Sequence, residues 1–513
     1  MRDVVILGGG HNGLVASVLL ARKGLKVTVV ESRPIVGGAA VTEFPFTKAP
    51  RLGTSTGAYL LGLMPPELMA ELKLDLELHR RDPHYFLPTT DKRYLLFGSN
   101  EAELRRQFVD YFSEADWNAN QAMNAELAAI RDDLAPAWLQ SPYSLEETAE
   151  RFIRPALRQA FIRLCRGSAR EYLERWNFKS DLVKAMYAIT DAFSGLHAGY
   201  DTPGGGMNLL VHNMCRLPGS GGTWMIVGGG MGAITQGLAK LAQQAGAEIR
   251  TSSPVARILS DGNVVRGVAL ESGEELLAKV VVSNADPFKT MSLVGEERLP
   301  KDYVAGVNRL RTDGTTFKLN LALKGLPRFT CLPEDRGQFG PTIHLMPDER
   351  VVLSELERAY REVTEGKLPE FPSIEWYIHT TVDPSLRDPD GHHNSALFVQ
   401  WVPYELKGTT WEQQEEKYAK HLLSVCDRFA PGTSDLVVDM FALSPAKVEK
   451  YFGITRGHIH HVDNKYGFNE RPAYRMPMEG LYLCGAGCHP AGSVIGASGH
   501  NAAQQVLKDL ALA

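Results

Sequence analysis

The stretch that most constrains how this chain can fold lies within its first 31 residues. Residues 3–7 (DVVIL) form a short apolar run of the kind found in a buried parallel strand. They lead directly into residues 8–13 (GGGHNG), which have the spacing G-x-G-x-x-G. A helical stretch follows to Lys23, and residues 26–30 (KVTVV) have the pattern of a second strand that ends at Glu31. This order of elements, closed by an acid, predicts a dinucleotide-binding βαβ unit.

Each part of this unit has a physical role. Gly8 allows the tight turn, Gly10 lets the backbone approach a pyrophosphate, and Gly13 lets the helix pack close to the strand. Free N–H groups at the helix start face the phosphate charge, and Glu31 accepts hydrogen bonds from ribose hydroxyls. The predicted cofactor contacts in this unit are Gly8, Gly10, His11, Asn12, Gly13, Glu31 and Ser32.

A Gly37-Gly38 pair follows the acid, within the segment 33–42 (RPIVGGAAVT). Residues 4–42 as a whole resemble the extended dinucleotide-binding motif of the two-domain flavoproteins, so the resemblance implies FAD rather than NAD, with contacts from Gly37, Gly38 and Ala39. The best overall match is the phytoene desaturase-like family of carotenoid desaturases, carotenoid isomerases and related flavin oxidoreductases, to which amine oxidases are more distant relatives. Many members carry arginine where this chain has Ala39.

A second motif stands near the end of the chain. Residues 480–490 (GLYLCGAGCHP) have the pattern of a strand that ends in a glycine turn, and residues 491–503 begin a terminal helix. This segment is similar to the C-terminal flavin motif of the same family. The resemblance implies that Gly485 and Ala486 offer backbone N–H groups to the pyrophosphate. It also implies that a helix start near Ser493 and Val494 places its positive dipole end at the flavin pyrimidine ring.

Length and motif order together predict an α/β protein with more than one domain. At 513 residues the chain is too long for one ordinary core. We expect a Rossmann-like FAD-binding domain of the two-domain flavoprotein type, with a mixed-sheet substrate domain and a helical cap. The predicted FAD-binding domain comprises residues 1–80, 224–286 and 457–513, and the substrate domain comprises residues 81–223, which include the cap, and 287–456. By resemblance, Val255 holds the adenine through its backbone.

Composition excludes several classes of partner. A net charge of −5 gives no indication of nucleic-acid binding. No apolar run is long enough to span a bilayer, and the first predicted strand begins at residue 3, so we expect a cytoplasmic protein without a targeting peptide. Peripheral membrane contact and a homodimer both stay open. The six cysteines are scattered without a C-x-x-C pair, which favours free thiols in a reducing compartment.

A second glycine cluster, residues 228–232 (GGGMG), invites interpretation as another nucleotide site. Its glycines have a different spacing, and no acid follows a clean second strand, so we interpret it as a structural loop before a helix. The absence of a second dinucleotide fold and of a redox cysteine pair argues against disulfide reductase chemistry driven by NAD(P)H.

Candidate catalytic residues are few. His489 lies beside the C-terminal motif and is the first candidate for moving a substrate proton, although a histidine that caps the turn before Pro490 is an equal alternative. Tyr59 is a weaker candidate as a cavity-lining residue, with a buried core tyrosine as the alternative. Lys318 lies in an alternating strand over residues 316–323, and we expect it to face solvent rather than to act as the flavin-side lysine of amine oxidases.

No metal site is expected. His458, His460 and His461 are close in sequence, but only Asp463 stands near them as a further ligand, so the cluster does not make up a metal site. We expect this segment to shape the substrate cavity instead.

The resemblance implies an FAD-dependent oxidoreductase, a dehydrogenase or desaturase. It would transfer hydride from a C–C bond of a hydrophobic small molecule, such as a polyene or isoprenoid, to flavin N5, with O2 or a quinone as electron acceptor. Three alternatives stay open: a flavin amine oxidase, a carotenoid-type isomerase that uses reduced FAD without net oxidation, and an interaction protein stabilised by FAD.

Overall fold

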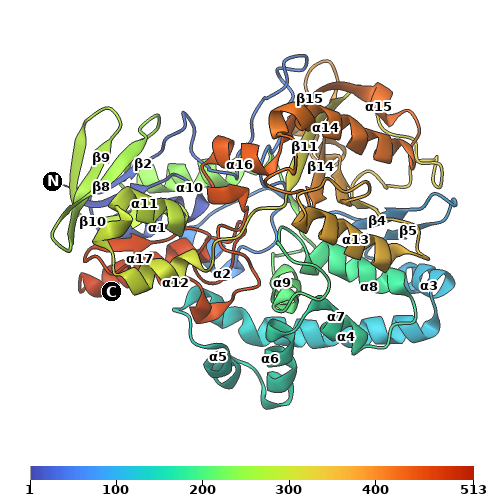
Figure 1. Ribbon diagram of the computed structural model, residues 1–513, viewed down its shortest axis with the longest axis horizontal. Helices are drawn as coiled ribbons and strands as arrows, with labels where there is room; N and C mark the ends of the chain where they lie inside the picture. The colour runs from blue at the N-terminus through green and yellow to red at the C-terminus, as the bar shows by residue number, and fades with distance from the viewer. Residues whose placement is uncertain (1, 513) are drawn as a thin grey trace.

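The computed structural model describes residues 2–512, and its two seven-stranded β-sheets lie in two lobes side by side (Figure 1). The first sheet has the order β7-β2-β1-β10-β9-β8, with β16 paired to β10. Its strands are β1 (Arg2–Leu7), β2 (Val27–Val30), β7 (Glu248–Arg250), β8 (Val255–Asp261), β9 (Val264–Leu270), β10 (Glu275–Ser283) and β16 (Leu481–Leu483). Strands far apart in the sequence therefore meet in one sheet.

The core of this sheet is parallel, as the apolar run at the N-terminus predicted. β1 pairs in parallel with β2 and β10, and β16 pairs in parallel with β10. Val4, Val5 and Ile6 are fully buried in the apolar core of this lobe. α1 (His11–Arg22) follows β1 and packs against both α10 (Gly232–Gln244) and α17 (Ala497–Asp509). The predicted strand–turn–helix–strand unit is confirmed.

The second sheet has the order β15-β11-β14-β13-β12-β4-β5 and forms the other lobe. Its strands are β4 (Tyr85–Pro88), β5 (Tyr94–Phe97), β11 (Phe317–Leu323), β12 (Thr342–Leu345), β13 (Ser373–Tyr377), β14 (His393–Gln400) and β15 (Val437–Leu443). All neighbours are antiparallel except β12 and β4, so the sheet is mixed. β4 and β5 form an antiparallel hairpin at one edge of this sheet.

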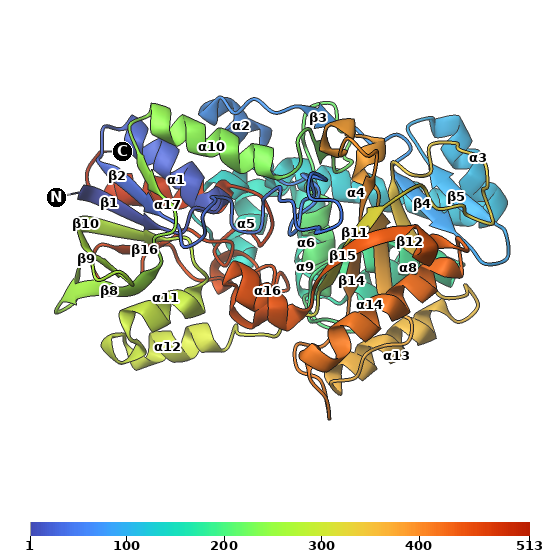
Figure 2. The ribbon, with the colours of Figure 1, turned by 90° about the horizontal axis from the view of Figure 1, so that it is seen from above.

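One face of this sheet is covered by α14 (Trp411–Asp427), which lies across the strands (Figure 2). Phe317, Leu319 and Leu321 of β11 pack in the same apolar cluster as Trp411 and Tyr418 of that helix. Because strand residues alternate between faces, the residues between them on β11 point to the opposite face. That opposite face lines the cavity described below.

A helical lobe built from residues 101–212 closes the cavity from a third side, in agreement with the predicted cap. Its helices are α3 (Glu101–Tyr111), α4 (Glu114–Leu134), α5 (Leu145–Phe152), α6 (Arg158–Arg166), α7 (Ala169–Glu174), α8 (Asp181–Tyr187) and α9 (Gly205–His212). Ser144 accepts the Glu147 N–H at the start of α5, and Ser168 and Glu171 form a complete capping box at α7. After α8 the chain continues as one turn of π-helix, Ala188–Ala192.

The remaining elements are α2 (Pro66–Leu72), β3 (Leu78–His79), β6 (Ile226–Val227), α11 (Pro287–Val294), α12 (Lys301–Asn308), α13 (Val352–Thr364), α15 (Thr433–Leu436) and α16 (Pro445–Phe452). β6 pairs with β3 and not with the parallel sheet, so the glycines at 228–232 do not open a second nucleotide-binding unit. Gly230 and Gly232 instead pack against Thr42.

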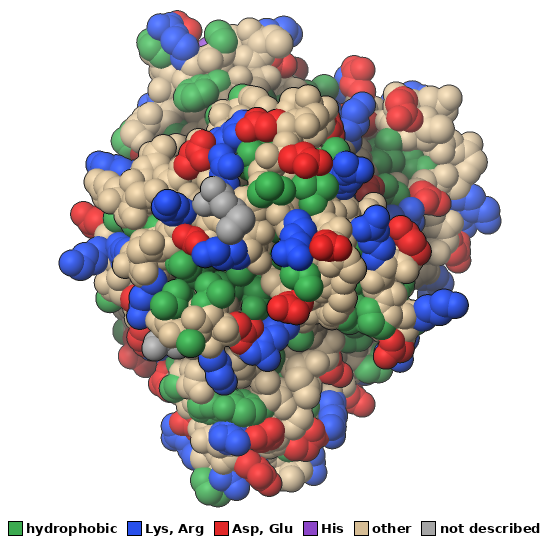
Figure 3. All heavy atoms as spheres, turned by 90° about the vertical axis from the view of Figure 1, so that its left-hand side faces the viewer, with side chains coloured by type: hydrophobic (Ala, Val, Ile, Leu, Met, Phe, Trp, Pro, Cys, Tyr) green, Lys and Arg blue, Asp and Glu red, His purple; other side chains and the backbone are tan. Residues whose placement is uncertain are grey.

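The surface at the free end of the first lobe carries both signs of charge (Figure 3). Positive and negative side chains are interspersed there and form ion pairs such as Arg250–Glu274 and Lys279–Asp3.

No helix within residues 2–512 has the length and apolarity that crossing a bilayer requires. The six cysteines are all buried and free, as predicted.

Candidate active site

The turn after β1 is shaped by glycines for three different reasons. Gly8 has φ +96°, a backbone conformation that favours glycine. A Cβ on Gly10 would lie 2.7 Å from Asn284 Nδ2, and a Cβ on Gly13 would lie 2.4 Å from the Gly8 carbonyl oxygen. The strand end and the start of α1 can therefore approach each other only because side chains are absent.

Glu31 closes the unit as the motif predicts. Its carboxylate accepts the Gly9 N–H at 2.8 Å and the Arg33 N–H at 2.8 Å, so it is held at the carboxyl end of β2. The Gly37 N–H in turn donates to the Gly9 carbonyl at 2.8 Å. Gly37 and Gly38 both have positive φ values, +132° and +59°, which explains the glycine pair.

The two termini of the chain converge on this turn. The α17 residue Gly499 lies so close to α1 that a Cβ there would be 2.0 Å from the Asn12 carbonyl oxygen. Ser498 Oγ donates to the Gly485 carbonyl at 2.8 Å, which fixes the C-terminal glycine turn on the helix start. The helix begins at Ala497 after Gly496, not near Val494 as expected, because Gly496 has φ +80° and ends the preceding loop.

One cavity of about 1020 Å³ runs from this crevice into the interior between the lobes. The predicted contacts that line it are Gly8, Gly10, His11, Asn12, Glu31, Ser32, Gly37, Gly38, Ala39, Val255, Ala486, Ser493 and Val494. Gly13 and Gly485 do not line it and lie behind its wall. Their part is to permit close packing, and any contact of theirs with a ligand stays a prediction.

The crevice fits the cofactor that the motifs imply. The glycines at residues 8–13 and 37–38 form a cradle that side chains on these residues would occupy. The first residues of α1 border this cradle. His11 lines the crevice, and its Nε2 is buried without a hydrogen-bond partner among the described residues. Burial lowers the pKa of His11 to about 4, so the ring is neutral and offers this nitrogen to a ligand.

The inner part of the cavity is floored by the second sheet. Successive cross-strand partners form a row: Leu443 pairs with Lys318, Lys318 with Phe398, Phe398 with Glu375, and Glu375 with His344. All five line the cavity. Paired residues on adjacent strands point to the same face, so the row runs from the crevice side toward β12.

Lys318 corrects the expectation of a solvent-facing lysine. Its side chain is only 3% exposed, and Nζ donates to the carbonyl oxygens of Ser55, at 2.6 Å, and of Gly57. Burial holds the pKa of Lys318 well below its usual value. The alternating pattern identified the strand correctly, but both faces of β11 are buried, one under α14 and one at the cavity.

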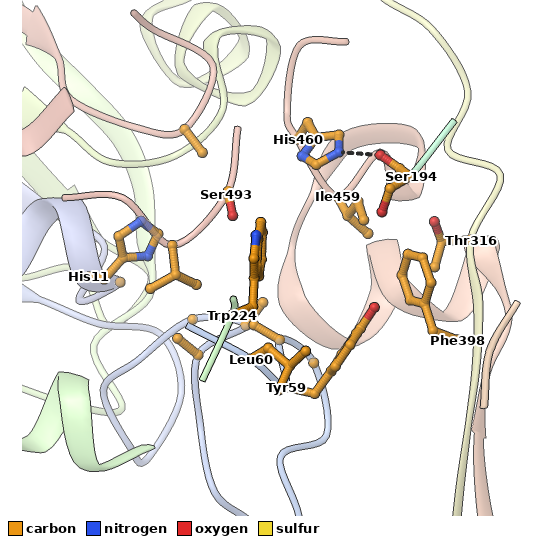
Figure 4. Close-up of a pocket in the computed structure, with 18 of the residues that line it drawn as sticks. His11, Tyr59, Leu60, Ser194, Trp224, Thr316, Phe398, Ile459, His460 and Ser493 are labelled. Atoms are coloured by element: carbon orange, nitrogen blue, oxygen red, sulfur yellow. Dashed lines mark hydrogen bonds between the residues drawn. The ribbon is translucent and has the colours of Figure 1, made fainter. Parts of the chain in front are cut away.

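Tyr59 lies beside this lysine and lines the cavity. The Lys318 Nζ is 4.6 Å from the centre of its ring, and Tyr59 also contacts Phe398 and Tyr377, with ring centres 5.3 and 4.5 Å away. Figure 4 shows Tyr59 and Phe398 on one side of the pocket and His11 and Ser493 on the other, with Trp224 between them. A catalytic role for Tyr59 stays a prediction.

His489 is not among the residues that line the cavity. It is buried, and its Nε2 is 3.1 Å from the Ala137 carbonyl, while its own carbonyl accepts the Tyr474 hydroxyl. These contacts tie the C-terminal turn to the helical lobe, because Ala137 belongs to the segment after α4. The structure therefore corrects the expectation that His489 handles a substrate proton, and the turn position was the better interpretation.

Two of the three clustered histidines bind other protein groups through their rings, whereas Nδ1 of His461 is buried without a hydrogen-bond partner among the described residues. His460 Nε2 is 3.0 Å from the Ser194 carbonyl, the contact drawn in Figure 4, and His458 pairs with the buried Asp463 at 3.3 Å. His460 and His461 line the cavity, so the segment does shape it. Within residues 2–512 the side chains close enough to share a metal ion are Asp388, Asp390 and His392, away from this cluster.

The far end of the cavity holds polar residues that sequence reasoning missed. Arg81, Tyr85, Asp191, His344 and Glu375 all line it. Burial raises the pKa of Glu375 to about 8 and of Asp191 to about 7, and lowers the pKa of His344 to about 3. One signal was present: a glutamate in the middle of the apolar strand 373–377. Tyr85 and His344 lie on the short strands β4 and β12, whereas Arg81 lies in a loop and Asp191 in the π-helical turn, where there is no periodicity to interpret.

Comparison with known proteins places these features in a wider group. Residues 13–328 match the family described as flavin containing amine oxidoreductase. The chain is 35% identical to a rat protein named pyridine nucleotide-disulfide oxidoreductase domain-containing protein 2, over 99% of this chain and 94% of the relative. It is 24% identical to a hydroxyneurosporene desaturase of Cereibacter sphaeroides, over 99% and 98% of the two chains.

The fold is shared with solved structures as well. The structure of a putrescine oxidase bound to putrescine superposes with a TM-score of 0.61 at 16% identity and covers 100% of this chain and 99% of that one. At this identity the likeness shows the fold alone. The rat relative's name refers to disulfide oxidoreductases, whereas the cysteines of this chain are buried and unpaired.

Proposed function

The chain belongs to the flavin containing amine oxidoreductase family, and from this premise we propose that it oxidises a C–C bond of a largely hydrophobic small molecule. That it is an FAD-dependent oxidoreductase follows from the family and from the cradle formed by both terminal motifs. The observation that carries the finer proposal is the single continuous cavity that runs from the crevice to the second sheet. Its middle is lined by Tyr59, Leu60, Trp224, Phe398 and Ile459, which exclude water from the reacting carbon.

The residues that would hold FAD are those of the crevice. Backbone N–H groups at the start of α1 would hold the pyrophosphate, Glu31 would accept hydrogen bonds from a ribose, and Ala486, Ser493 and Val494 would contact the other half. FAD supplies a two-electron acceptor that takes up a hydride when it is bound there. Orientation of the substrate is the task of the apolar side chains, which hold it between the crevice and the sheet.

Loss of hydride from one carbon leaves a proton to be removed from its neighbour. Lys318 is suited to take up that proton, because burial lowers the pKa of its amine and Nζ is held by the carbonyl oxygens of Ser55 and Gly57. The neutral form of the amine has a lone pair that can accept a proton beside Tyr59. This assignment replaces His489, which the cavity does not reach.

An anaerobic flavin reduction assay tests the proposal. The purified yellow protein is mixed without oxygen with an isoprenoid polyene, and separately with a primary amine of similar size. We expect the polyene to bleach the flavin band near ~450 nm and to gain one double bond. Lys318→Met should slow the bleaching, whereas Arg350→Gln, at an exposed surface ion pair, serves as the control.

Three outcomes would contradict it. Bleaching by the amine alone would support the amine oxidase alternative. Conversion of the polyene to a geometric isomer without bleaching would support the isomerase. A protein that binds FAD but reacts with nothing, even after chemical reduction and reoxidation, would support the interaction protein.

A further inference from the structure

The far end of the cavity contains a buried positive charge that the protein itself does not pair. Arg81 is 5% exposed, and its Nε and Nη1 donate to the Trp224 carbonyl and to Thr342 Oγ1. Its Nη2 has no hydrogen-bond partner within residues 2–512, and no carboxylate there lies within ion-pair distance of the guanidinium. Burying such a charge without a counter-ion is costly, so the arrangement points to a charge supplied by a ligand.

Other hydrogen-bonding atoms around Arg81 are also left without partners. The Tyr85 hydroxyl and both ring nitrogens of His344 are buried and make no hydrogen bond among the described residues. The two rings stack at 4.2 Å, and Tyr85 stands opposite Thr342, the residue that holds Arg81. Native proteins rarely leave buried polar atoms unpaired, and several that line one cavity mark a binding site.

The acidic residues nearby do not supply the missing charge. Glu375 is buried, and one of its oxygens accepts the Tyr377 hydroxyl while the other has no partner. Burial raises the pKa of Glu375 and of Asp191 to near or above neutrality, so both tend to keep their protons. Arg80 and Arg131 line the cavity further out, beside Gly221 and Gly222, and add positive charge along its wall.

We propose that the substrate carries a carboxylate at one end, which binds Arg81 with the Tyr85 hydroxyl and His344, while its apolar part extends to the crevice. This inference rests on the proposed function, since it names the substrate class of the same cavity. The row from His344 to Lys318 crosses three strand spacings of about 4.8 Å, roughly 14 Å, which leaves room for a short isoprenoid or acyl chain. One carboxylate matches Arg81, the buried guanidinium at this end of the cavity that has no counter-ion among the described residues.

A matched series of probes tests the inference. Geranate, geraniol and geranylamine have the same ten-carbon skeleton and differ in the head group. Their binding to the holoprotein is measured by titration calorimetry, with the flavin reduced so that no probe is consumed. We expect geranate to bind roughly ten- to a hundredfold more tightly than geraniol, the effect of hydrogen bonds to a charged group, and geranylamine to bind most weakly.

Substitutions locate the effect. Arg81→Gln should weaken geranate binding by roughly the same factor and change geraniol binding by less than about threefold, since only the anion uses the charge. Arg81→Lys keeps the charge and should retain part of the preference. Arg350→Gln removes one positive charge from the surface and should leave all three affinities unchanged. If Arg81→Gln does not fold, the wild-type ranking and Arg81→Lys decide.

The inference is overturned if geranate binds no more tightly than geraniol, if geranylamine binds most tightly, or if Arg81→Gln weakens both neutral and anionic probes alike. Its failure is separable from that of the proposed function. If geraniol and geranate both bleach the flavin and bind with equal affinity, the proposed function stands and the carboxylate site is rejected. Selective geranate binding without any bleaching would keep the site and reject the C–C oxidation.

Discussion

Substitution of Gly13 by alanine should impair FAD binding although this residue does not line the cavity. The added Cβ would lie 2.4 Å from the Gly8 carbonyl oxygen and 3.1 Å from Asn284 Cβ. The first contact is about 1 Å shorter than an ordinary van der Waals contact, and the atom met is backbone, which has no rotamer to change. The start of α1 must then move away from the end of β1, at a cost of about 1–3 kcal/mol in folding free energy.

The same movement shifts the N–H groups that face the pyrophosphate. Loss of one hydrogen bond to a charged group corresponds to roughly ten- to a hundredfold in affinity. We therefore expect Gly13→Ala to be purified with a reduced ratio of flavin to protein. Titration of the apoprotein with FAD, followed by flavin fluorescence, should give a dissociation constant raised by that factor, and the melting temperature should fall.

Gly306→Ala is the matched control, because Gly306 lies inside α12 and the nearest atom to an added Cβ is 3.8 Å away. Alanine there should be neutral or stabilise the protein by up to about 1 kcal/mol, since it favours the helix. Wild-type FAD affinity and melting temperature in Gly13→Ala would refute the packing argument. An equal loss in both variants would show that the effect is not specific to the turn.

Three further predictions concern buried charged groups. Lys318→Met should gain most in stability over the wild type at low pH, because the pKa of Lys318 is lower in the folded than in the unfolded wild type, so that wild-type stability rises as pH increases toward 10.5. Urea unfolding at pH 6, 7.5 and 9 checks this, and a difference in unfolding free energy between variant and wild type that does not shrink as pH rises would contradict it. The wild type should lose stability as pH rises from 4.5 to about 8, because the folded Glu375 carboxyl keeps its proton in this range and the unfolded one does not. Glu375→Gln should remove this loss, so its unfolding free energy, measured in urea at pH 5, 6.5 and 8, should vary less with pH than that of the wild type. Arg471→Met should cost about 3–5 kcal/mol in urea unfolding, because this buried guanidinium joins the preceding segment to the C-terminal motif by donating to the carbonyls of Val462 and Ala486. A cost under about 1 kcal/mol would rule out that role.

The cofactor half of the site could be predicted because its signals are local. Gly8, Gly10, Gly13 and Glu31 lie within one strand–turn–helix–strand unit, where each residue type is required by the turn or the ligand. The C-terminal motif was recognisable for the same reason, although only the fold brings Gly499 against Asn12. The error there was small: the helix begins at Ala497 because Gly496 holds the loop in a left-handed conformation.

The substrate half was decided by tertiary structure. Alternation along β11 shows that Lys318 and Phe317 lie on opposite faces, but it does not show what covers each face. Here α14 covers one face and the cavity opens on the other, so Lys318 is buried rather than solvated. His489 was misplaced for a related reason, since closeness in sequence to the cofactor motif does not decide on which side of a turn a ring lies.

By itself, then, the sequence determined the dinucleotide-binding turn and the strands that flank it, because these depend on residues near in the chain and on periodicity within one element. The choice of FAD and the helical cap came from the resemblance to a known family. The row from Lys318 to His344 and the unpaired Arg81 at its end depend on the pairing of strands joined by long connections. Such pairing is selected by the packing of the whole lobe, so the polar end of the cavity exists only in the folded protein.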